Sequence, residues 1–173
     1  KIQSIYHDFG SAVIGGDTGI VMQNRGSFFS LDDNHPNRLE PGKRTFHTII
    51  PAMMLKDGEP VLAYGTMGGD GQPQTQAAML TRLVDFGYDV QQAIEAPRWL
   101  MGRTWGMESR DLWLESRISD ETARELRLRG QPVKMVGQWD GTLGHAQAIR
   151  IDRKNGLFEG GADPRGDGAA MGY

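Results

Sequence analysis

Residues 61–76, with the sequence VLAYGTMGGDGQPQTQ, are the stretch that decides the fold. The apolar run at 61–64 is typical of a strand, and it leads into a cluster of glycines before Pro73 opens a helical pattern. A strand, a glycine turn and a helix start leave backbone N–H groups free to bind an anion or the oxyanion of an acyl-transfer intermediate. A tight turn whose glycines only supply positive φ explains the same spacing, so both interpretations stay open here.

Composition narrows the classes of partner. The chain has 173 residues, a formal net charge of −3 and 24% charged residues, which is typical of a folded domain without a broad attraction for nucleic acid. Apolar runs fall short of the roughly 18 residues that span a bilayer, so neither a nucleic-acid nor a membrane partner is expected. The absence of cysteine excludes disulfides and thiolate chemistry, and it favours the cytoplasm over a periplasmic or secreted location.

No metal site or cofactor is expected either. The histidines at 7, 35, 47 and 145 are scattered, without the HxH or HExxH spacing of metal ligands. The glycine turn lacks the patterns that bind dinucleotides or nucleoside triphosphates, and the chain has no GxSxG nucleophile motif.

The order of elements predicts an α+β fold in a single domain, residues 1–173. Strands come first, helices occupy the middle, and strands return, with hairpin turns at Asp57-Gly58 and Asn155-Gly156. Asp89 with Gln92 forms a possible capping box for a short helix. The expected strands are 11–14, 19–22, 45–55, 61–64, 113–115, 133–136, 146–151 and 157–160, and the expected longer helices are 74–86 and the one that Ser119 caps.

Two further positions are candidates from pattern alone. Arg25 follows an expected strand and could bind a carboxylate through its fork of donors, although a solvated loop arginine is an equal alternative. His47 and Thr48 lie in the strand expected to pair with the glycine-turn strand, so one of them could reach the turn. Ordinary strand polarity explains them equally well.

Several stretches together resemble the small subunit of the γ-glutamyltransferase family. They are FGSAVIGGDTGIVMQNRG, PGKRTFHTIIPAM, YGTMGGDG, VQQAIEAPRW and GGADPRGDGAAMGY. The resemblance implies the small-subunit portion of an N-terminal-nucleophile hydrolase, a four-layer αββα sandwich. It implies a precursor that cuts itself, a large subunit from that precursor as partner, no cofactor, and a small-molecule amide substrate. It also allows a dimer of heterodimers.

The same resemblance implies roles for individual residues. Gly68 and Gly69 match the glycine pair whose N–H groups form the oxyanion hole, and Ser4 matches a threonine that hydrogen-bonds the nucleophile. His47 and Thr48 match a serine pair that binds the substrate α-carboxylate. The remaining substrate-binding positions, which hold an ammonium in the family, are here Tyr6, Arg25 and Phe28.

These last three residues depart from the family pattern. A cation replaces an ammonium-binding group, and an apolar ring replaces the carboxylate, so the site should repel an α-ammonium and prefer an anionic or neutral group. The expected function is therefore a γ-glutamyltransferase-like amide hydrolase or acyl transferase, acting on γ-glutamyl amides such as glutathione or on related acid amides such as glutaryl amides and oxamate.

The nucleophile itself is the weak point of this expectation. The nucleophilic threonine is expected upstream of Lys1, so the chain reads as a fragment without its nucleophile segment. The alternatives are a catalytically inactive family member that binds or assembles, and, more remotely, a module that binds phosphate at the glycine turn.

Overall fold

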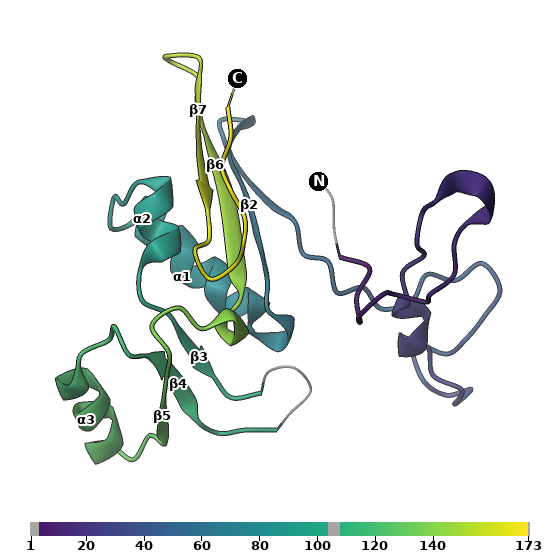
Figure 1. Ribbon diagram of the computed structural model, residues 1–173, viewed down its shortest axis with the longest axis horizontal. Coiled ribbons are helices and arrows are strands. Elements are labelled where there is room, and N and C mark those ends of the chain that lie inside the picture. The colour runs from purple at the N-terminus through teal and green to yellow at the C-terminus, as the bar shows by residue number, and fades with distance from the viewer. Residues whose placement is uncertain (1–3, 104–107, 173) are drawn as a thin grey trace. The chain divides into compact units, whose positions relative to one another are not determined.

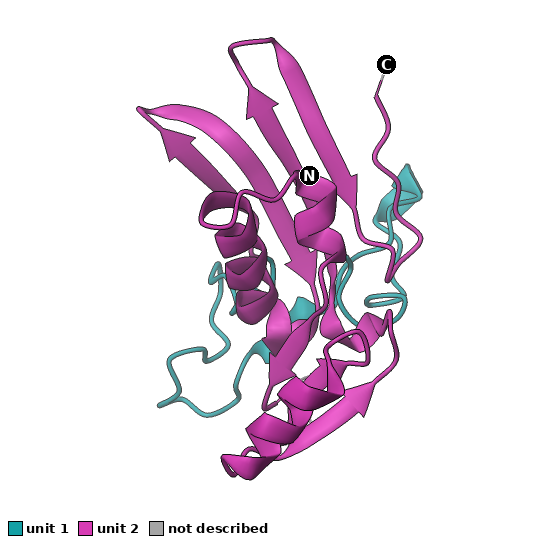
Figure 2. Cartoon of the chain, turned by 90° about the vertical axis from the view of Figure 1, so that its left-hand side faces the viewer, with its two compact units in different colours: residues 1–49 teal, residues 50–173 magenta. Residues whose placement is uncertain are grey.

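A computed structural model describes residues 4–103 and 108–172 of the chain. They form two compact units, residues 1–49 and 50–173, which Figure 2 distinguishes by colour. Each unit is described by itself below, and the single-domain organisation of 1–173 stays a prediction. No helix in the described ranges is long and apolar enough to cross a bilayer.

The first unit has little regular structure. Its helical turns are η1 (Gly16–Thr18) and η2 (Arg25–Phe28). The strands expected at 11–14 and 19–22 are wrong, because only an isolated bridge between Ile14 and Val21 forms there. Ala12 has a φ of 57°, and this left-handed conformation interrupts the extended backbone that a strand needs.

The second unit is built on a four-stranded antiparallel sheet in the order β1-β2-β6-β7 (Figure 1). Its strands are β1 (Ala52–Lys56), β2 (Glu59–Met67), β6 (His145–Asp152) and β7 (Leu157–Ala162). Both predicted hairpins are confirmed, and Asp57 and Gly58 take the positive φ values, 53° and 80°, that a two-residue hairpin turn favours.

The first hairpin strand is shorter than expected. It begins at Ala52 rather than at residue 45, so the prediction that His47 and Thr48 lie in a strand paired with β2 is wrong. Pro51 directly precedes the strand, and proline has no N–H to donate to a ladder. Both residues belong to the first unit.

Two helices cover one face of this sheet (Figures 1 and 2). They are α1 (Gln72–Val84) and α2 (Val90–Glu95), and the capping box of Asp89 and Gln92 is confirmed. The core between sheet and helices is apolar and tightly closed. Its buried members are Leu62, Met79, Val90, Ala93, Ile94, Ala146 and Ala148.

The opposite face of the same sheet has no cover of this kind. Side chains alternate along a strand, so Ile149 points away from its buried neighbour Ala148. Ile149 is 47% exposed, and Met53 and Phe158 are 61% and 75% exposed. The sheet therefore presents large apolar side chains on the face that carries neither α1 nor α2.

A smaller sheet, β3-β4-β5, completes the unit. It contains β3 (Trp99–Met101), β4 (Leu112–Glu115) and β5 (Val133–Val136), and α3 (Asp120–Leu128) is the crossover between the parallel strands β4 and β5. Ser119 caps α3 as expected, accepting a hydrogen bond from the N–H of Thr122.

Candidate functional site

The glycine turn lies where β2 ends and α1 begins. After Met67 the backbone turns at Gly68, with a φ of 139°, and at Gly69, with a φ of 54°. The short helical turn η3 (Gly69–Gly71) then leads into α1, where Pro73 stands in the first turn. Side chains rarely adopt such positive φ values, so the geometry of this turn requires glycine at 68 and 69.

A second glycine, Gly144, directly precedes β6 and lies against this turn. The register pairs Met67 with His145, so the next residues outward are Gly68 and Gly144. A Cβ on Gly68 would lie 3.0 Å from the Cα of Gly144, and a Cβ on Gly144 would overlap the carbonyl oxygen of Met67. The two backbones are in close contact, and neither glycine position has room for a side chain larger than a hydrogen atom.

The carbonyl oxygens of Gly68 and Gly69 accept hydrogen bonds, while the N–H groups of these two residues donate to none of the described residues. The oxygen of Gly68 accepts from the N–H of Gly71 at 3.0 Å, and the oxygen of Gly69 accepts from the side-chain amide of Gln72 at 3.2 Å. Among the residues that the structure describes, no hydrogen bond uses the N–H of Gly68 or Gly69. Gly68 is buried and Gly69 half-buried, so a ligand oxygen would find two unsatisfied donors there.

In the first unit, Arg25 organises a polar cluster. Its side chain is 3% exposed, and its Nε donates to the hydroxyl of Thr48 at 2.7 Å. Its Nη1 donates to the carbonyl oxygen of Ser4 at 3.0 Å, and its Nη2 donates to the hydroxyl of Ser4 at 3.2 Å. Arg25 forms no ion pair with a carboxylate of the described residues, so it is a buried cation whose hydrogen-bond partners are all neutral.

Aromatic rings stand beside this cation. The guanidinium carbon of Arg25 lies 5.5 Å from the centre of the Tyr6 ring, within the range of a cation–π contact. The Tyr6 and Phe28 rings are 4.9 Å apart. The structure thus brings together five of the residues singled out from sequence, namely Ser4, Tyr6, Arg25, Phe28 and Thr48.

His47 stands apart from this cluster. It is exposed, and its Nδ1 accepts a hydrogen bond from the N–H of Ile49 at 3.3 Å. No contact of the described residues joins its ring to Arg25.

The second unit also contains a cluster of buried charges that was not predicted from the sequence. Arg98 and Arg165 are buried together with Glu115, at 0% exposure, and Asp163, at 1%. Arg98 pairs with Asp163, while Arg165 bridges Asp163 at 3.0 Å and Glu115 at 2.7 Å. Arg117, which is partly exposed, also donates to Glu115 at 2.6 Å. The available signal was a glutamate inside the apolar strand Leu112–Glu115 and the ADPR sequence after β7.

The arginines of this cluster also hold the end of α2. The carbonyl oxygen of Ile94 accepts from Arg98 at 3.2 Å and from Arg165 at 3.1 Å, and that of Glu95 accepts from Arg117 at 2.7 Å. Cations at a helix C-terminus satisfy its unpaired carbonyls and oppose its dipole. Burial lowers the pKa of Arg98 to about 10, although the carboxylate of Asp163 counteracts this shift.

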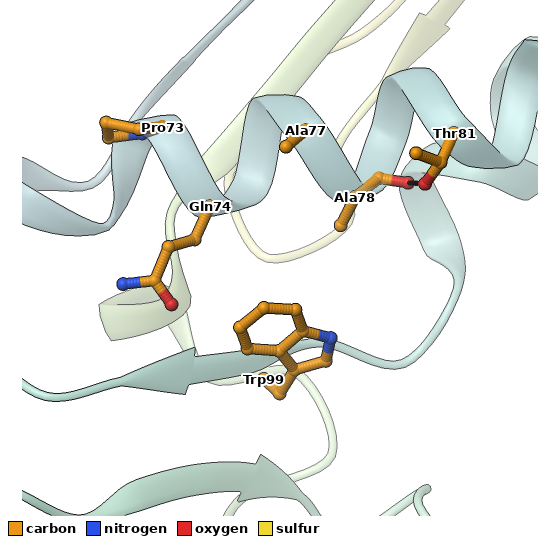
Figure 3. Close-up of a pocket in the computed structure, with 6 residues that line it drawn as sticks. All are labelled: Pro73, Gln74, Ala77, Ala78, Thr81 and Trp99. Atoms are coloured by element: carbon orange, nitrogen blue, oxygen red, sulfur yellow. Dashed lines mark hydrogen bonds between the residues drawn. The ribbon is translucent and has the colours of Figure 1, made fainter.

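An apolar groove lies between α1 and β3 (Figure 3). Trp99 forms its floor beneath Ala78 and Gln74, and the Gln74 amide donates to the carbonyl oxygen of Met101 at 2.9 Å. None of the predicted site residues lines this groove. Within 4–103 and 108–172, no group of three acidic, histidine or cysteine side chains lies close enough together to hold a metal ion.

The family model for gamma-glutamyltranspeptidase matches residues 1–173, the whole chain. The chain belongs to the gamma-glutamyltranspeptidase family. This confirms the resemblance drawn from the five sequence stretches.

Two curated relatives and one solved structure illustrate the match. The chain is 58% identical to the glutathione hydrolase-like YwrD proenzyme of Bacillus subtilis, over 99% of this chain and 32% of that protein. It is 53% identical to the oxamate amidohydrolase proenzyme of Klebsiella pneumoniae, again over 99% of this chain and 32% of the relative. The crystal structure of cephalosporin acylase from Bacillus halodurans superposes with a TM-score of 0.80 at 40% identity, covering 99% of this chain and 32% of that one.

These comparisons confirm the α+β, N-terminal-nucleophile hydrolase class of the fold. The chain spans about a third of the length of these gamma-glutamyltranspeptidase relatives. The roles of individual residues remain predictions from the resemblance and the geometry.

The fork of Arg25 gives a first prediction. In Arg25→Lys, one ammonium replaces a planar fork that reaches both Ser4 and Thr48, so at least one hydroxyl or carbonyl oxygen of these residues loses its donor. We expect the free energy of unfolding to fall by about 1–3 kcal/mol, measured by urea denaturation. The control Arg44→Lys changes an exposed arginine and should shift it by no more than about 0.5 kcal/mol. Equal values for the two variants would contradict the structural role of the fork.

Proposed function

We propose that this chain is the small subunit of an amide hydrolase or acyl transferase, and that its glycine turn is the oxyanion hole. The observation that carries the proposal is the pair of N–H groups at Gly68 and Gly69, which no described residue accepts and which lie at a strand end before a helix. The family and the names of the relatives support it, since these include a glutathione hydrolase-like proenzyme and an oxamate amidohydrolase proenzyme.

The chemistry follows from those two donors. In the proposed reaction a threonine hydroxyl attacks the amide carbon, its proton passes to the α-amine of the same threonine, and the carbonyl oxygen becomes negative. The N–H groups of Gly68 and Gly69 would stabilise that oxyanion more strongly than the neutral carbonyl, which lowers the barrier. The proton then leaves with the amine, and water or an acceptor amine releases the acyl group from the threonine.

Arg25 sets the proposed preference for the acyl group. It is a buried guanidinium without a carboxylate partner among the described residues, and three of its five N–H groups are used by Ser4 and Thr48. A substrate carboxylate would bind the remaining donors, while an ammonium would be repelled. Tyr6 and Phe28 add aromatic surface rather than an acid, so we propose an acid amide that lacks a free amine.

A substrate panel tests this function on the complete processed protein. We expect glutaryl-p-nitroanilide or oxamate to be hydrolysed with a higher kcat/KM than γ-glutamyl-p-nitroanilide. The rate is measured by the release of p-nitroaniline or ammonia. Arg25→Gln should lower the ratio of these kcat/KM values by about tenfold, equivalent to about 1.4 kcal/mol. A clear preference for the γ-glutamyl compound would refute the substrate assignment. Inactivity toward all three would favour a binding or assembly subunit.

The oxyanion hole gives a separate prediction. In Gly68→Ala, the added Cβ meets the Gly144 backbone and the residue cannot keep a φ of 139° without strain, so the donor must move. We expect kcat to fall by about 10²–10³ with a small change in KM. Gly58→Ala is the matched control, because Gly58 also has a positive φ but open space around it. A kcat for Gly68→Ala equal to that of the control would rule out the oxyanion role.

The uncovered face of the four-stranded sheet supports a proposed partner. The relatives are proenzymes about three times as long as this chain. On this face, Met53, Ile149 and Phe158 expose more apolar surface than is usual for a sheet face in contact with water. We propose that the large subunit from the same precursor packs its own sheet on this face, which would complete the sandwich of the fold class.

A charge on this face should prevent that packing. In the processed protein, Ile149→Glu places a carboxylate against the partner sheet, and we expect the large subunit to be lost on affinity purification of the small one. Leu128→Glu, on α3 and 74% exposed, is the control and should leave the pair intact. Retention of the large subunit by both variants would place the interface elsewhere.

A further inference from the structure

The buried charges of the second unit need an explanation beyond stability. A buried ion pair is often no more stabilising than well-packed apolar residues of the same volume. This cluster nevertheless places two arginines and two carboxylates in the interior, each satisfied by further hydrogen bonds. Stability alone therefore does not explain the cluster, and its role lies in the backbone segments that it holds in place.

Two members of the cluster hold the start of β6. Arg98 donates from Nη1 to the carbonyl oxygen of Gly144 at 2.6 Å. Asp163 accepts the N–H of Ala146 on its Oδ2 at 2.7 Å, and the same oxygen accepts from Arg98. The ion pair thus grips the backbone on both sides of His145, through charge-assisted hydrogen bonds that are stronger than neutral ones.

The backbone segment that Arg98 and Asp163 hold is the one that contacts the glycine turn. Gly144 lies against Met67 and Gly68 so closely that neither glycine could carry a Cβ. A shift of Gly144 by a fraction of an ångström must therefore move the Gly68 peptide or open a gap beside it. The position of the turn depends on the position of Gly144, and that in turn on Arg98 and Asp163.

We infer that Asp163 and Arg98 are positioning residues that aim the N–H groups of Gly68 and Gly69 by holding Gly144. They act through the backbone of β6. The inference rests on the proposed oxyanion hole and extends it to residues remote in sequence, since 95 positions separate Gly68 from Asp163.

The cluster offers a matched pair of variants for the test. Asp163→Asn and Glu115→Gln each replace a buried carboxylate of the same network by an amide of the same shape, so each removes one negative charge. Of the two carboxylates, only Asp163 bonds directly to β6, where it accepts the N–H of Ala146. Glu115 bonds to the arginine side chains and to the backbone N–H of Arg98. Both variants should therefore lose stability, but only the first should disturb the turn.

The measurement is a kcat and KM comparison on the processed protein, with melting temperatures recorded alongside. For Asp163→Asn we expect kcat to fall by about 10- to 100-fold with KM within about threefold, because small misplacements of catalytic groups are costly. For Glu115→Gln we expect kcat within about threefold of the wild type at a similar loss of melting temperature. Equal kcat losses in the two variants would overturn the positioning role.

A second pair of variants covers the case in which Asp163→Asn does not fold. Gly144→Ala and Gly156→Ala both place alanine at a positive φ, 88° and 67°, but only the first meets Met67. We expect kcat to fall in Gly144→Ala alone. Equal kcat in this pair would overturn the inference, while a wild-type protein inactive on every acid amide would refute the oxyanion hole itself.

Discussion

The close approach of two glycines, Gly68 at the end of β2 and Gly144 before β6, is the constraint on which the second unit depends. It is possible only because neither residue has a side chain, and it leaves the turn no freedom to drift. The buried ion pair of Arg98 and Asp163 holds one side of this contact, and α1 begins directly after the other. Sheet, helix and charge cluster thus meet at one short stretch of backbone.

Much of this arrangement could be read from the sequence, because its causes are local. The two hairpins follow from Asp57-Gly58 and Asn155-Gly156, and the start of α2 follows from the capping box at Asp89. The strand expected at 45–55 does not form in its first half, because Pro51 ends the pairing with β2. Pro51 is a local signal, but the prediction gave more weight to the β-rich composition of the segment.

The rest could not be predicted, because its causes are long-range. Glu115 and Arg165 are 50 positions apart, and nothing in the spacing of either indicates that they meet in the interior. The cluster around Arg25 was different, since the family resemblance singled out Ser4, Tyr6, Phe28 and Thr48. The structure brings Ser4, Tyr6 and Thr48 to the same guanidinium, and Phe28 packs against Tyr6. Contacts of this kind are set by the tertiary fold and need either a structure or a known relative.

The apolar face of the four-stranded sheet has a consequence for how such a protein is made. Two separate chains would have to associate at the low concentrations of the cell. Until then, one of them would expose Phe158 and Met53 and would be prone to aggregate. If the chain is joined to the proposed large subunit in one polypeptide, the two would meet at an effective local concentration in the millimolar range and would be produced in equal numbers. Cleavage after folding would then sever a tether that has already served its purpose.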